Sequence, residues 1–278
     1  MLPVFIYSNL IMMSSRLLLN SSRRAKETLI FLLCFSIVTV LVSCRDKETE
    51  EEQVVTVNPP AVRVNFLNRV GDSAIVAGHF YDRDGGESFS LDLFKYYISH
   101  AALVSDAGDT LYLNEHTLID EFDANRRGFS ACPSIDGLNS AHFNQMIFAL
   151  GVDQQHNTSG DQAGDLDPVY GMIWTWSTGY IFLKHEGQFL SSTGTTEPLL
   201  YHLGTVKAFT PVSLPIDIHL ENEKQFNINV KFDLNKMYSA VSNIVFEGNN
   251  VIQSTAPNDL PWILEMKANI AQSFSIVN

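Results

Sequence analysis

The sequence predicts a mainly β protein, an antiparallel β-sandwich-like single domain over residues 61–278 with a few short helices, one of them near the C-terminus. Three observations carry this prediction. Short segments that alternate apolar and polar residues follow one another, each bounded by turn residues, as in antiparallel sandwiches and barrels. Strands do not alternate with helices, which argues against a parallel α/β fold. Helical periodicity stays weak until about residue 234.

The expected elements follow in chain order. "AVRVNFLN" at 61–68 and "SAIVAGHFY" at 73–81 are separated by a Gly-Asp turn, so they predict a β-hairpin that opens the domain. Pro261 lies in the first turn of the last helical segment, a position that proline favours. No internal repeat and no linker divides residues 61–278. The other expected strands are 91–99, 109–114, 141–150, 172–187, 198–206, 213–220 and 224–234, and the expected helices are 234–241 and 260–275.

Residues 1–43 resemble a bacterial lipoprotein signal peptide. The basic segment 23–26 precedes an apolar run at 29–42, and "LVSC" then ends the signal, so we expect cleavage before Cys44 and lipidation of its thiol. The alternative is a transmembrane anchor, but the run is shorter than the ~20 residues of a spanning helix. The segment before residue 23 is unusually long for a signal peptide, and translation could instead start at Met12 or Met13. Residues 44–60 form an acidic tether.

The mature chain is strongly acidic. Removing residues 1–43 takes four basic and one acidic residue from totals of 18 and 31, which leaves 14 and 30 and a net charge of −16. We therefore expect no nucleic-acid partner, because phosphate binding needs a basic surface. Cys34 lies in the signal and Cys44 carries the lipid, so Cys132 is the one remaining thiol and no intrachain disulfide is expected.

The sequence contains no motif that supports catalysis, and we expect no enzyme. It lacks G-x-S-x-G, a phosphate-binding glycine loop and H-E-x-x-H. The loop at 151–171 is rich in aspartate and glycine. Such residues bind Ca²⁺ or cap turns, and we expect ordered turns capped by carboxylates, next to the W-x-W segment. The eight histidines show no tight ligand spacing. His202 is the one histidine that we consider as a ligand from its position, because it interrupts the apolar strand "LLYHLG", where it could also form a structural hydrogen bond to a neighbouring strand.

Four segments in this order resemble the MbnP-like family of periplasmic copper-binding proteins: "LDLFKYYIS", "LGVD", "GDLDPVYGMIWTWSTGYIFLKHEG" and "YHLG". The resemblance implies a β-sandwich-like domain with a mononuclear copper ion held by histidine imidazoles. It also implies a tryptophan oxidised to kynurenine at the site, with a diheme peroxidase of the MauG type as the modifying partner.

The resemblance also nominates site residues. His202 matches the family's Y-H-[IL]-G segment, and Trp174 and Trp176 match its W-x-W. The second histidine stays open: His79 enters the candidate set, and His100 and His185 are alternatives in strand-like segments. At position 100 the family more usually has asparagine. A regular strand would place both tryptophans on one face. Only an irregular turn at "STGY" would separate a core tryptophan from one near copper.

The sequence thus predicts an exported lipoprotein, anchored by lipid to the outer membrane on its periplasmic or surface face, that binds one copper ion. Imidazole ligands suit copper, and the chain offers no spare thiolates for a zinc cluster. The alternative is a non-catalytic cell-surface module without metal, in which exposed aromatic residues bind a glycan or a protein.

Overall fold

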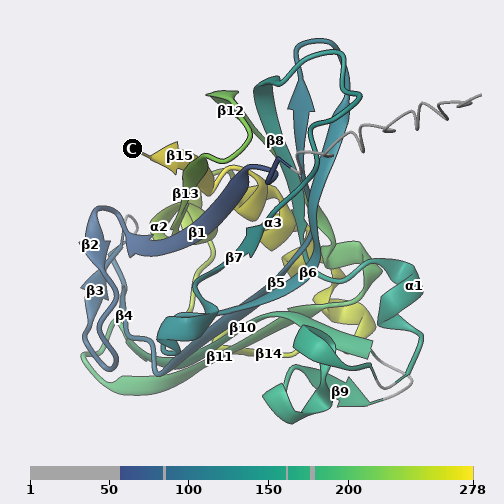
Figure 1. The fold of residues 1–278 in the computed structure, drawn as a ribbon. Helices are drawn as coiled ribbons and strands as arrows, with labels where there is room; N and C mark the ends of the chain where they lie inside the picture. The colour runs from purple at the N-terminus through teal and green to yellow at the C-terminus, as the bar shows by residue number, and fades with distance from the viewer. Residues whose placement is uncertain (1–56, 84–85, 161, 176–178, 278) are drawn as a thin grey trace, which may run out of the picture. The chain divides into compact units, whose positions relative to one another are not determined.

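The computed structural model describes residues 57–83, 86–160, 162–175 and 179–277 (Figure 1). They belong to one unit, Val54–Asn278, and the other unit, Met1–Gln53, lies outside the described residues. The expected signal peptide, Cys44 and most of the acidic tether therefore lie outside this description. No helix of the described part combines the length and apolarity of a membrane span.

The smaller of two sheets has the order β15-β13-β1-β2, with β7 also paired to β1. Val62, Val64 and Phe66 alternate along β1 and are fully buried, so one face of the strand packs against the core. β1 and β13 run parallel, whereas the other pairs of this sheet are antiparallel. Its strands are β1 (Ala61–Val70), β2 (Ser73–Ala74), β7 (Gly128–Ala131), β13 (Gln225–Asp233) and β15 (Phe274–Val277).

The larger sheet has the order β12-β8-β5-β10-β11-β14. β5 also pairs with β6, β10 pairs with β9 and β4, and β3 pairs with β4. All of these pairs are antiparallel except β11 with β14. The strands are β3 (Tyr81–Asp82), β4 (Ser88–Phe89), β5 (Leu93–Ser105), β6 (Thr110–Asp120), β8 (His142–Leu150), β9 (Ile173–Thr175), β10 (Gly179–Leu190), β11 (Thr196–Gly204), β12 (Thr210–His219) and β14 (Val251–Ile252).

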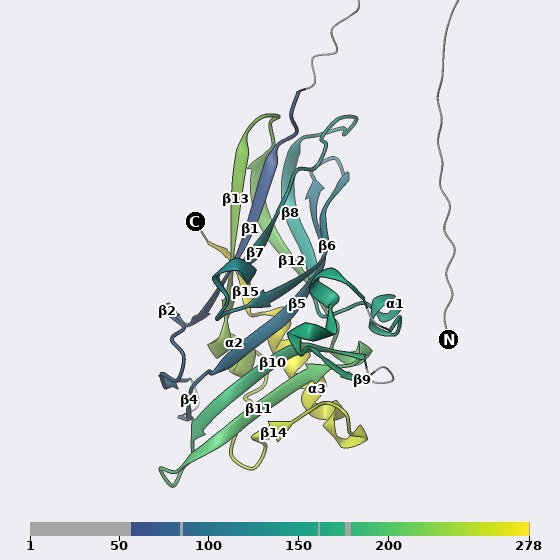
Figure 2. The ribbon, with the colours of Figure 1, turned by 60° about the horizontal axis from the view of Figure 1, so that its bottom comes forward.

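Three α-helices occur among the described residues: α1 (Gln154–Asn157), α2 (Leu234–Ser239) and α3 (Leu260–Ala271). Trp262 of α3 packs on Tyr201 of β11, with ring centroids 4.9 Å apart, so α3 covers the inner face of that strand (Figure 2). The 3₁₀ helices are η1 (Ala124–Arg126), η2 (Gly164–Leu166), η3 (Pro168–Tyr170), η4 (Val206–Ala208) and η5 (Pro257–Asp259).

The core is rich in aromatic residues. Tyr238 of α2 contacts the rings of Phe89, Tyr201 and Phe246, at centroid distances of 5.3, 6.2 and 4.9 Å. Phe232 of β13 stacks on Phe274 of β15 at 4.3 Å. Aromatic pairs at such distances add stability beyond their buried area. The sequence prediction of a mainly β fold with antiparallel sheets and a helix near the C-terminus is confirmed.

The strands expected at 91–99 and 109–114 extend further in the structure, to Ser105 and Asp120, and three other predicted elements differ more strongly. The strand expected at 73–81 stops at Ala74, because the Tyr81 hydroxyl accepts from the backbone N–H of Val76 and donates to the carbonyl of Ala74, where ladder partners would lie. The helix expected at 260–275 ends at Ala271, and Phe274 begins β15. The segment 172–187 is not one strand, because it contains the two antiparallel strands β9 and β10.

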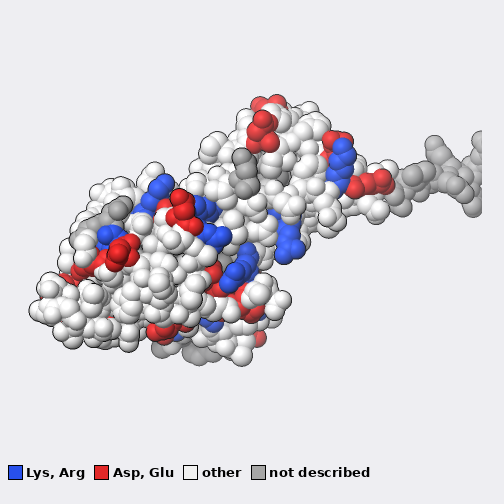
Figure 3. Space-filling model, turned by 90° about the vertical axis from the view of Figure 1, so that its left-hand side faces the viewer, with Lys and Arg blue, Asp and Glu red and all other residues white. Residues whose placement is uncertain are grey.

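Charged side chains of both signs are interspersed on the face drawn in Figure 3. Ion pairs among the described residues include Lys95 with Asp120 at 3.0 Å and Lys231 with Asp72 at 3.0 Å. A phosphate backbone binds along a continuous basic surface, and this face does not present one. That no nucleic acid binds stays a prediction.

Candidate metal centre

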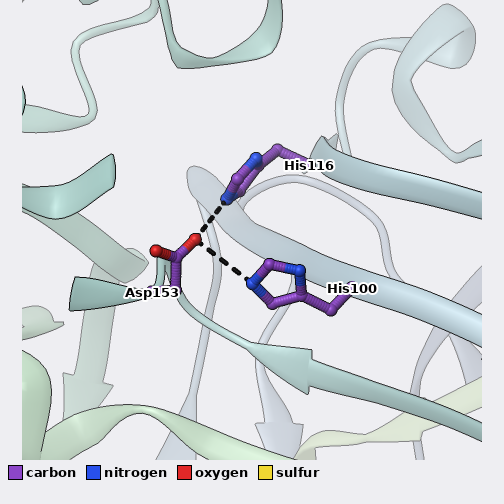
Figure 4. A group of neighbouring side chains, drawn as sticks. All are labelled: His100, His116 and Asp153. Carbon is purple, nitrogen blue, oxygen red and sulfur yellow. Dashed lines mark hydrogen bonds and ion pairs between the residues drawn. The ribbon is translucent and has the colours of Figure 1, made fainter. Parts of the chain in front are cut away.

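Two histidines and one aspartate, His100, His116 and Asp153, converge beside the large sheet (Figure 4), and His156 of α1 lies next to Asp153. Oδ2 of Asp153 lies 3.2 Å from Nε2 of His100, 3.1 Å from Nε2 of His116 and 2.7 Å from Nδ1 of His156. We call these four residues the histidine cluster. A single carboxylate oxygen with three imidazole nitrogens around it is a donor set that suits a transition metal.

A β-bulge directs His100 to the cluster. β5 pairs with β10 up to Tyr96 and with β8 from Ile98 onward, and the register with β8 shifts between Ser99 and Ala102. His100 lies in this shift and has a left-handed backbone, with φ of 53°. Non-glycine residues rarely adopt this conformation, and bulges redirect side chains next to functional sites. On the other edge of β5, His116 of β6 pairs with Ser99 and so lies beside the bulge.

Asp153 has two roles, one for each carboxylate oxygen. Its Oδ1 accepts the backbone N–H groups of Gln155 and His156, at 3.0 and 3.2 Å, and so caps α1. This cap fixes the carboxylate and places the His156 side chain, three residues later, on the same turn as Oδ2. The expected capping of turns in this loop is therefore found at Asp153, and Asp167 caps η3 in the same way.

The cluster is half-open to solvent. The exposed fraction of the side chain rises from 7% at His116 through 20% at Asp153 and 24% at His156 to 45% at His100. His116 is thus the inner ligand candidate and His100 the outer one. Three hollows border the cluster, and one of them, with a volume of about 300 Å³, is lined by His116 and His156 together with Gln162 and Leu166.

The electrostatics favour a charged Asp153 carboxylate beside a neutral His116 imidazole. Burial alone would raise the pKa of Asp153, but hydrogen bonds from the His156 backbone and imidazole, with His116, lower it to about 2. Burial lowers the pKa of His116, the neighbouring His156 lowers it further, and the hydrogen bond to Asp153 opposes both. A neutral imidazole has a free lone pair for a metal, and an anionic carboxylate balances the ion's charge.

The ligand atoms fall into two groups that share His116, namely His100, His116 and Asp153, and Glu115, His116 and His156, and the atoms within each group lie within 4.8 Å of one another. Ligand bonds of about 2.0–2.1 Å place neighbouring ligand atoms roughly 3 Å apart. The three separations between Asp153 Oδ2 and the imidazole nitrogens, 2.7, 3.1 and 3.2 Å, lie around this value. Glu115 adds a further carboxylate, with Oε1 3.4 Å from Nε2 of His156. His100, His116, His156, Asp153 and Glu115 are therefore the described residues that could hold a metal, as two groups that share His116.

His202, the histidine nominated from the sequence, lies elsewhere on the large sheet. On β11 it pairs in register with Lys184 of β10, and its Nε2 lies 2.9 Å from Oε1 of Glu186. The Lys184 ammonium lies 3.1 Å from the same Glu186 oxygen. Burial lowers the pKa of His202, and the hydrogen bond to Glu186 opposes this shift. A lysine beside the imidazole disfavours a cation at this position.

The structure brings Trp174 close to the strand of His202. A Cβ built on Gly204 would lie 2.5 Å from the Trp174 ring, so the indole covers Gly204, two residues after His202 on the same face of β11. The indole Nε1 is buried and has no hydrogen-bond partner among the described residues. Trp174 does not line the described hollows at the histidine cluster. Trp176 lies outside the described residues.

A family model described as MbnP matches residues 59–255, most of the described part of the chain. The chain belongs to the MbnP family. This confirms the family named from the sequence motifs.

Among solved structures, the fold is similar to that of MbnP from Methylosinus trichosporium. The two share 14% sequence identity with a TM-score of 0.50, over 80% of this chain and 99% of that one. At this identity the likeness concerns the fold of the MbnP family and not its site residues. A search of curated proteins finds no match.

Two other histidines considered from the MbnP resemblance are placed apart from the cluster. His79 is exposed in the connection between β2 and β3, where its ring lies 4.7 Å from that of Tyr81. His185 is fully buried in the core, with Nε2 3.0 Å from the Ser90 carbonyl and Nδ1 bonded to the Tyr238 hydroxyl. Both nitrogens of His185 are occupied by these bonds, and none is left for a metal.

Sequence reasoning missed His116, His156 and Asp153 as site residues. The histidines of the cluster stand at positions 100, 116 and 156, a spacing that matches no local metal motif. One local signal was present, because Asp153 and His156 stand in the spacing of a helix N-cap and its first turn. Only the strand register adds His100 and His116 to that pair.

Proposed function

We propose that this MbnP-family protein is an exported lipoprotein that binds a single copper ion through His100, His116, His156 and Asp153. The observation that carries the proposal is the convergence of three imidazole nitrogens on one carboxylate oxygen within 3.2 Å. Copper prefers imidazole over the water and carbonyl ligands that suit calcium or magnesium. The protein would carry the ion without catalysing a reaction.

Each ligand has a distinct part in this proposal. His116 is nearly buried, and its position is fixed by the pairing of β6 with β5. Asp153 and His156 are fixed by the α1 cap. His100 is the most exposed of the four, so it would be the side on which copper enters and leaves. The protein could then transfer the bound copper ion to an acceptor.

The proposal moves copper away from the residues nominated from the sequence. His202 contacts Glu186, which also binds the Lys184 ammonium, whereas the histidine cluster offers three imidazoles. The resemblance separately supports oxidation of Trp174 or Trp176 to kynurenine by a MauG-type diheme peroxidase. We retain that modification as part of the proposal, and mass spectrometry of the tryptophan peptide from the native host tests it.

Copper titration of the full-length protein in detergent tests the site. We expect His116→Ala to weaken copper binding more than about 100-fold, since even the loss of a residue that only supports a ligand typically costs about 10–100-fold. The matched control is His142→Ala. His142 also lies between carboxylates, 3.1 Å from Asp106 and 2.7 Å from Asp217, but outside the cluster, so its variant should bind like the unaltered protein.

The same titration separates the alternatives. His202→Ala should leave the affinity unchanged. Loss of binding in His202→Ala, with His116→Ala unaffected, would place copper at the residues nominated from the sequence. Absence of binding in the unaltered, folded protein would contradict the copper proposal and favour the surface module without metal.

A further inference from the structure

We infer that a hollow between the segment 243–252 and the start of α3 binds a neutral carbohydrate. We call it the α3 hollow. Among the described residues, it shares none of its lining with the hollows at the histidine cluster, so this function is independent of copper and goes beyond the proposed function. The inference follows from the size of the hollow, from its polar groups and from the charge of its lining.

The α3 hollow has the size of a small-ligand site. Its volume is about 470 Å³, and pockets for small molecules commonly span about 300–1,000 Å³. One wall is the segment 243–252, which includes β14, and the other is formed by residues 258–265 at the start of α3. A single sugar ring or a short oligosaccharide fits a space of this size.

Hydrogen bonds fix the wall at 243–252. The Arg83 guanidinium donates to the carbonyl of Ile244 at 2.5 Å. The Glu87 carboxylate accepts the backbone N–H of Phe246 at 3.1 Å. A ligand therefore meets a preformed wall, and little binding affinity is lost to ordering this segment.

Trp262 fixes the opposite wall and leaves a hydrogen-bond donor unsatisfied. Its ring packs on that of Tyr201, with centroids 4.9 Å apart. Its Nε1 is buried and has no hydrogen-bond partner among the described residues, a state that costs free energy. Since Trp262 lines the α3 hollow, a ligand oxygen there could supply the missing acceptor.

Further polar side chains of the α3 hollow are free to bind a ligand. Among the described residues, the side chains of Asn249, Asn258 and Glu265 form no hydrogen bond or ion pair, and all three residues are exposed. Amides both donate and accept hydrogen bonds, and carboxylates accept them. Sugar hydroxyls also donate and accept, so they match this mixed set of groups.

The charge of the lining selects against anions. Asp259 and Glu265 are acidic, and no lysine, arginine or histidine lines the α3 hollow within the described part of the chain. A phosphate, sulfate or carboxylate group on the ligand would therefore be repelled. Charge alone would also admit a cationic amine, but the amides and the indole N–H donate hydrogen bonds, which an ammonium group cannot accept. A neutral sugar satisfies both the donors and the acceptors.

Apolar side chains complete the lining. Val245 and Val251 are 48% and 52% exposed, and they line the α3 hollow together with Pro261. A sugar ring has hydroxyls around its edge and C–H groups on its faces. It can therefore bury apolar surface against the valines while its hydroxyls bind the polar groups of the hollow.

The test is a glycan array probed with the full-length protein in a detergent without a sugar head group. The array carries neutral oligosaccharides, sulfated oligosaccharides and amino sugars with free amines. We expect binding to neutral glycans that persists in the presence of a metal chelator. Calorimetric titration with the neutral oligosaccharide that binds best then gives the affinity. His116→Ala should bind this oligosaccharide with unchanged affinity, because His116 does not line the α3 hollow.

Three variants test whether the sugar binds in the α3 hollow. Glu265→Ala should weaken binding about 10-fold, because a hydrogen bond to a charged group is lost, and Asn258→Ala about 5-fold. Both positions are exposed, so these changes carry little risk to folding. Trp262→Phe keeps a ring against Tyr201 and removes the indole N–H, so it should weaken binding about 5-fold. Glu221→Ala is the control, because Glu221 is an exposed carboxylate that does not line the α3 hollow.

Three outcomes would overturn this inference. The first is a folded protein that binds no neutral glycan, and the second is binding confined to amino sugars or to sulfated glycans. The third is equal sugar affinity in the unaltered protein, Glu265→Ala and Asn258→Ala, because the sugar would then bind elsewhere on the domain. The two exposed positions keep the test decisive if Trp262→Phe fails to fold. Copper binding at the histidine cluster is titrated separately and does not depend on these results.

Discussion

His185 shows how a single buried residue ties stability to pH. Its imidazole is fully buried, and burial lowers its pKa to about 4. Since the ordinary pKa is about 6.5, the unfolded chain binds a proton over a range in which the folded chain does not. Stability from His185 is thus complete above pH 6.5 and is lost as the pH falls towards 4. The pKa of His116 and of His202 is lowered in the same direction.

We predict that the free energy of unfolding falls by roughly 2–4 kcal/mol between pH 7 and pH 4 through His185. Urea denaturation at a series of pH values measures this. His185→Gln should be less stable at pH 7 but should depend less on pH over the same interval. The control is His79→Gln, whose exposed ring lies outside the core and should leave the pH profile unchanged. Equal slopes for the unaltered protein and His185→Gln would contradict this account.

The elements were predicted from the sequence where the signal is local. Alternation of apolar and polar residues located β1, β8, β11 and β13, because burial of one face depends only on neighbouring positions. The prediction of a strand over 73–81 was wrong because a tertiary contact, the Tyr81 hydroxyl, takes the backbone groups of Ala74 and Val76. Local patterns contain no information on such contacts.

The metal centre depends on long-range pairing, and only part of it could therefore be predicted from the sequence. The sequence singled out His100 as a feature of this chain. It did not indicate the β-bulge, in which the backbone of His100 has a positive φ. His116 joins it through the register of β5 and β6, in which Ser99 lies opposite His116. The parallel pairing of β1 with β13 likewise joins segments that lie far apart in the sequence, 61–69 with 225–233. Register of this kind is fixed by the whole fold.

The bulge in β5 yields a prediction about backbone strain. At φ of 53°, His100→Asn should be tolerated, because asparagine enters the left-handed region readily, whereas His100→Val should not. We expect the valine variant to be about 1–2 kcal/mol less stable than the asparagine variant. Both lack the imidazole, so urea denaturation with a chelator present compares the backbone effect alone.

The same pair of substitutions at Tyr112 serves as control. Tyr112 lies in β6 with 74% of its surface exposed, and a β-branched residue is favoured in a strand. Valine should therefore be equal to or better than asparagine at Tyr112. Equal stability of the two variants at position 100 would show that the bulge stores no strain.

At the scale of the whole molecule, the described domain is stabilised by its core without covalent cross-links. Among the described residues, Cys132 is a free, exposed thiol. The packed aromatic residues around Tyr238 join α2 to β4 and β11 of the large sheet. Such a domain has no need of an oxidising compartment to fold, so the expectation of export rests on the N-terminal segment alone.

The expected lipid anchor at Cys44 is testable on the whole cell. Cys44 follows a basic segment and an apolar run at 29–42, which is the order of a lipoprotein signal. If acyl chains on Cys44 anchor the protein, loss of the lipid should release it. We predict that Cys44→Ala moves the chain from the membrane fraction to the soluble fraction on cell fractionation. Cys132→Ala, which removes the exposed thiol of the domain, should remain with the membranes. Retention of Cys44→Ala in the membrane fraction would contradict the lipid anchor. The apolar run at 29–42 would then stay uncleaved and anchor the protein in the membrane as a helix, without acyl chains.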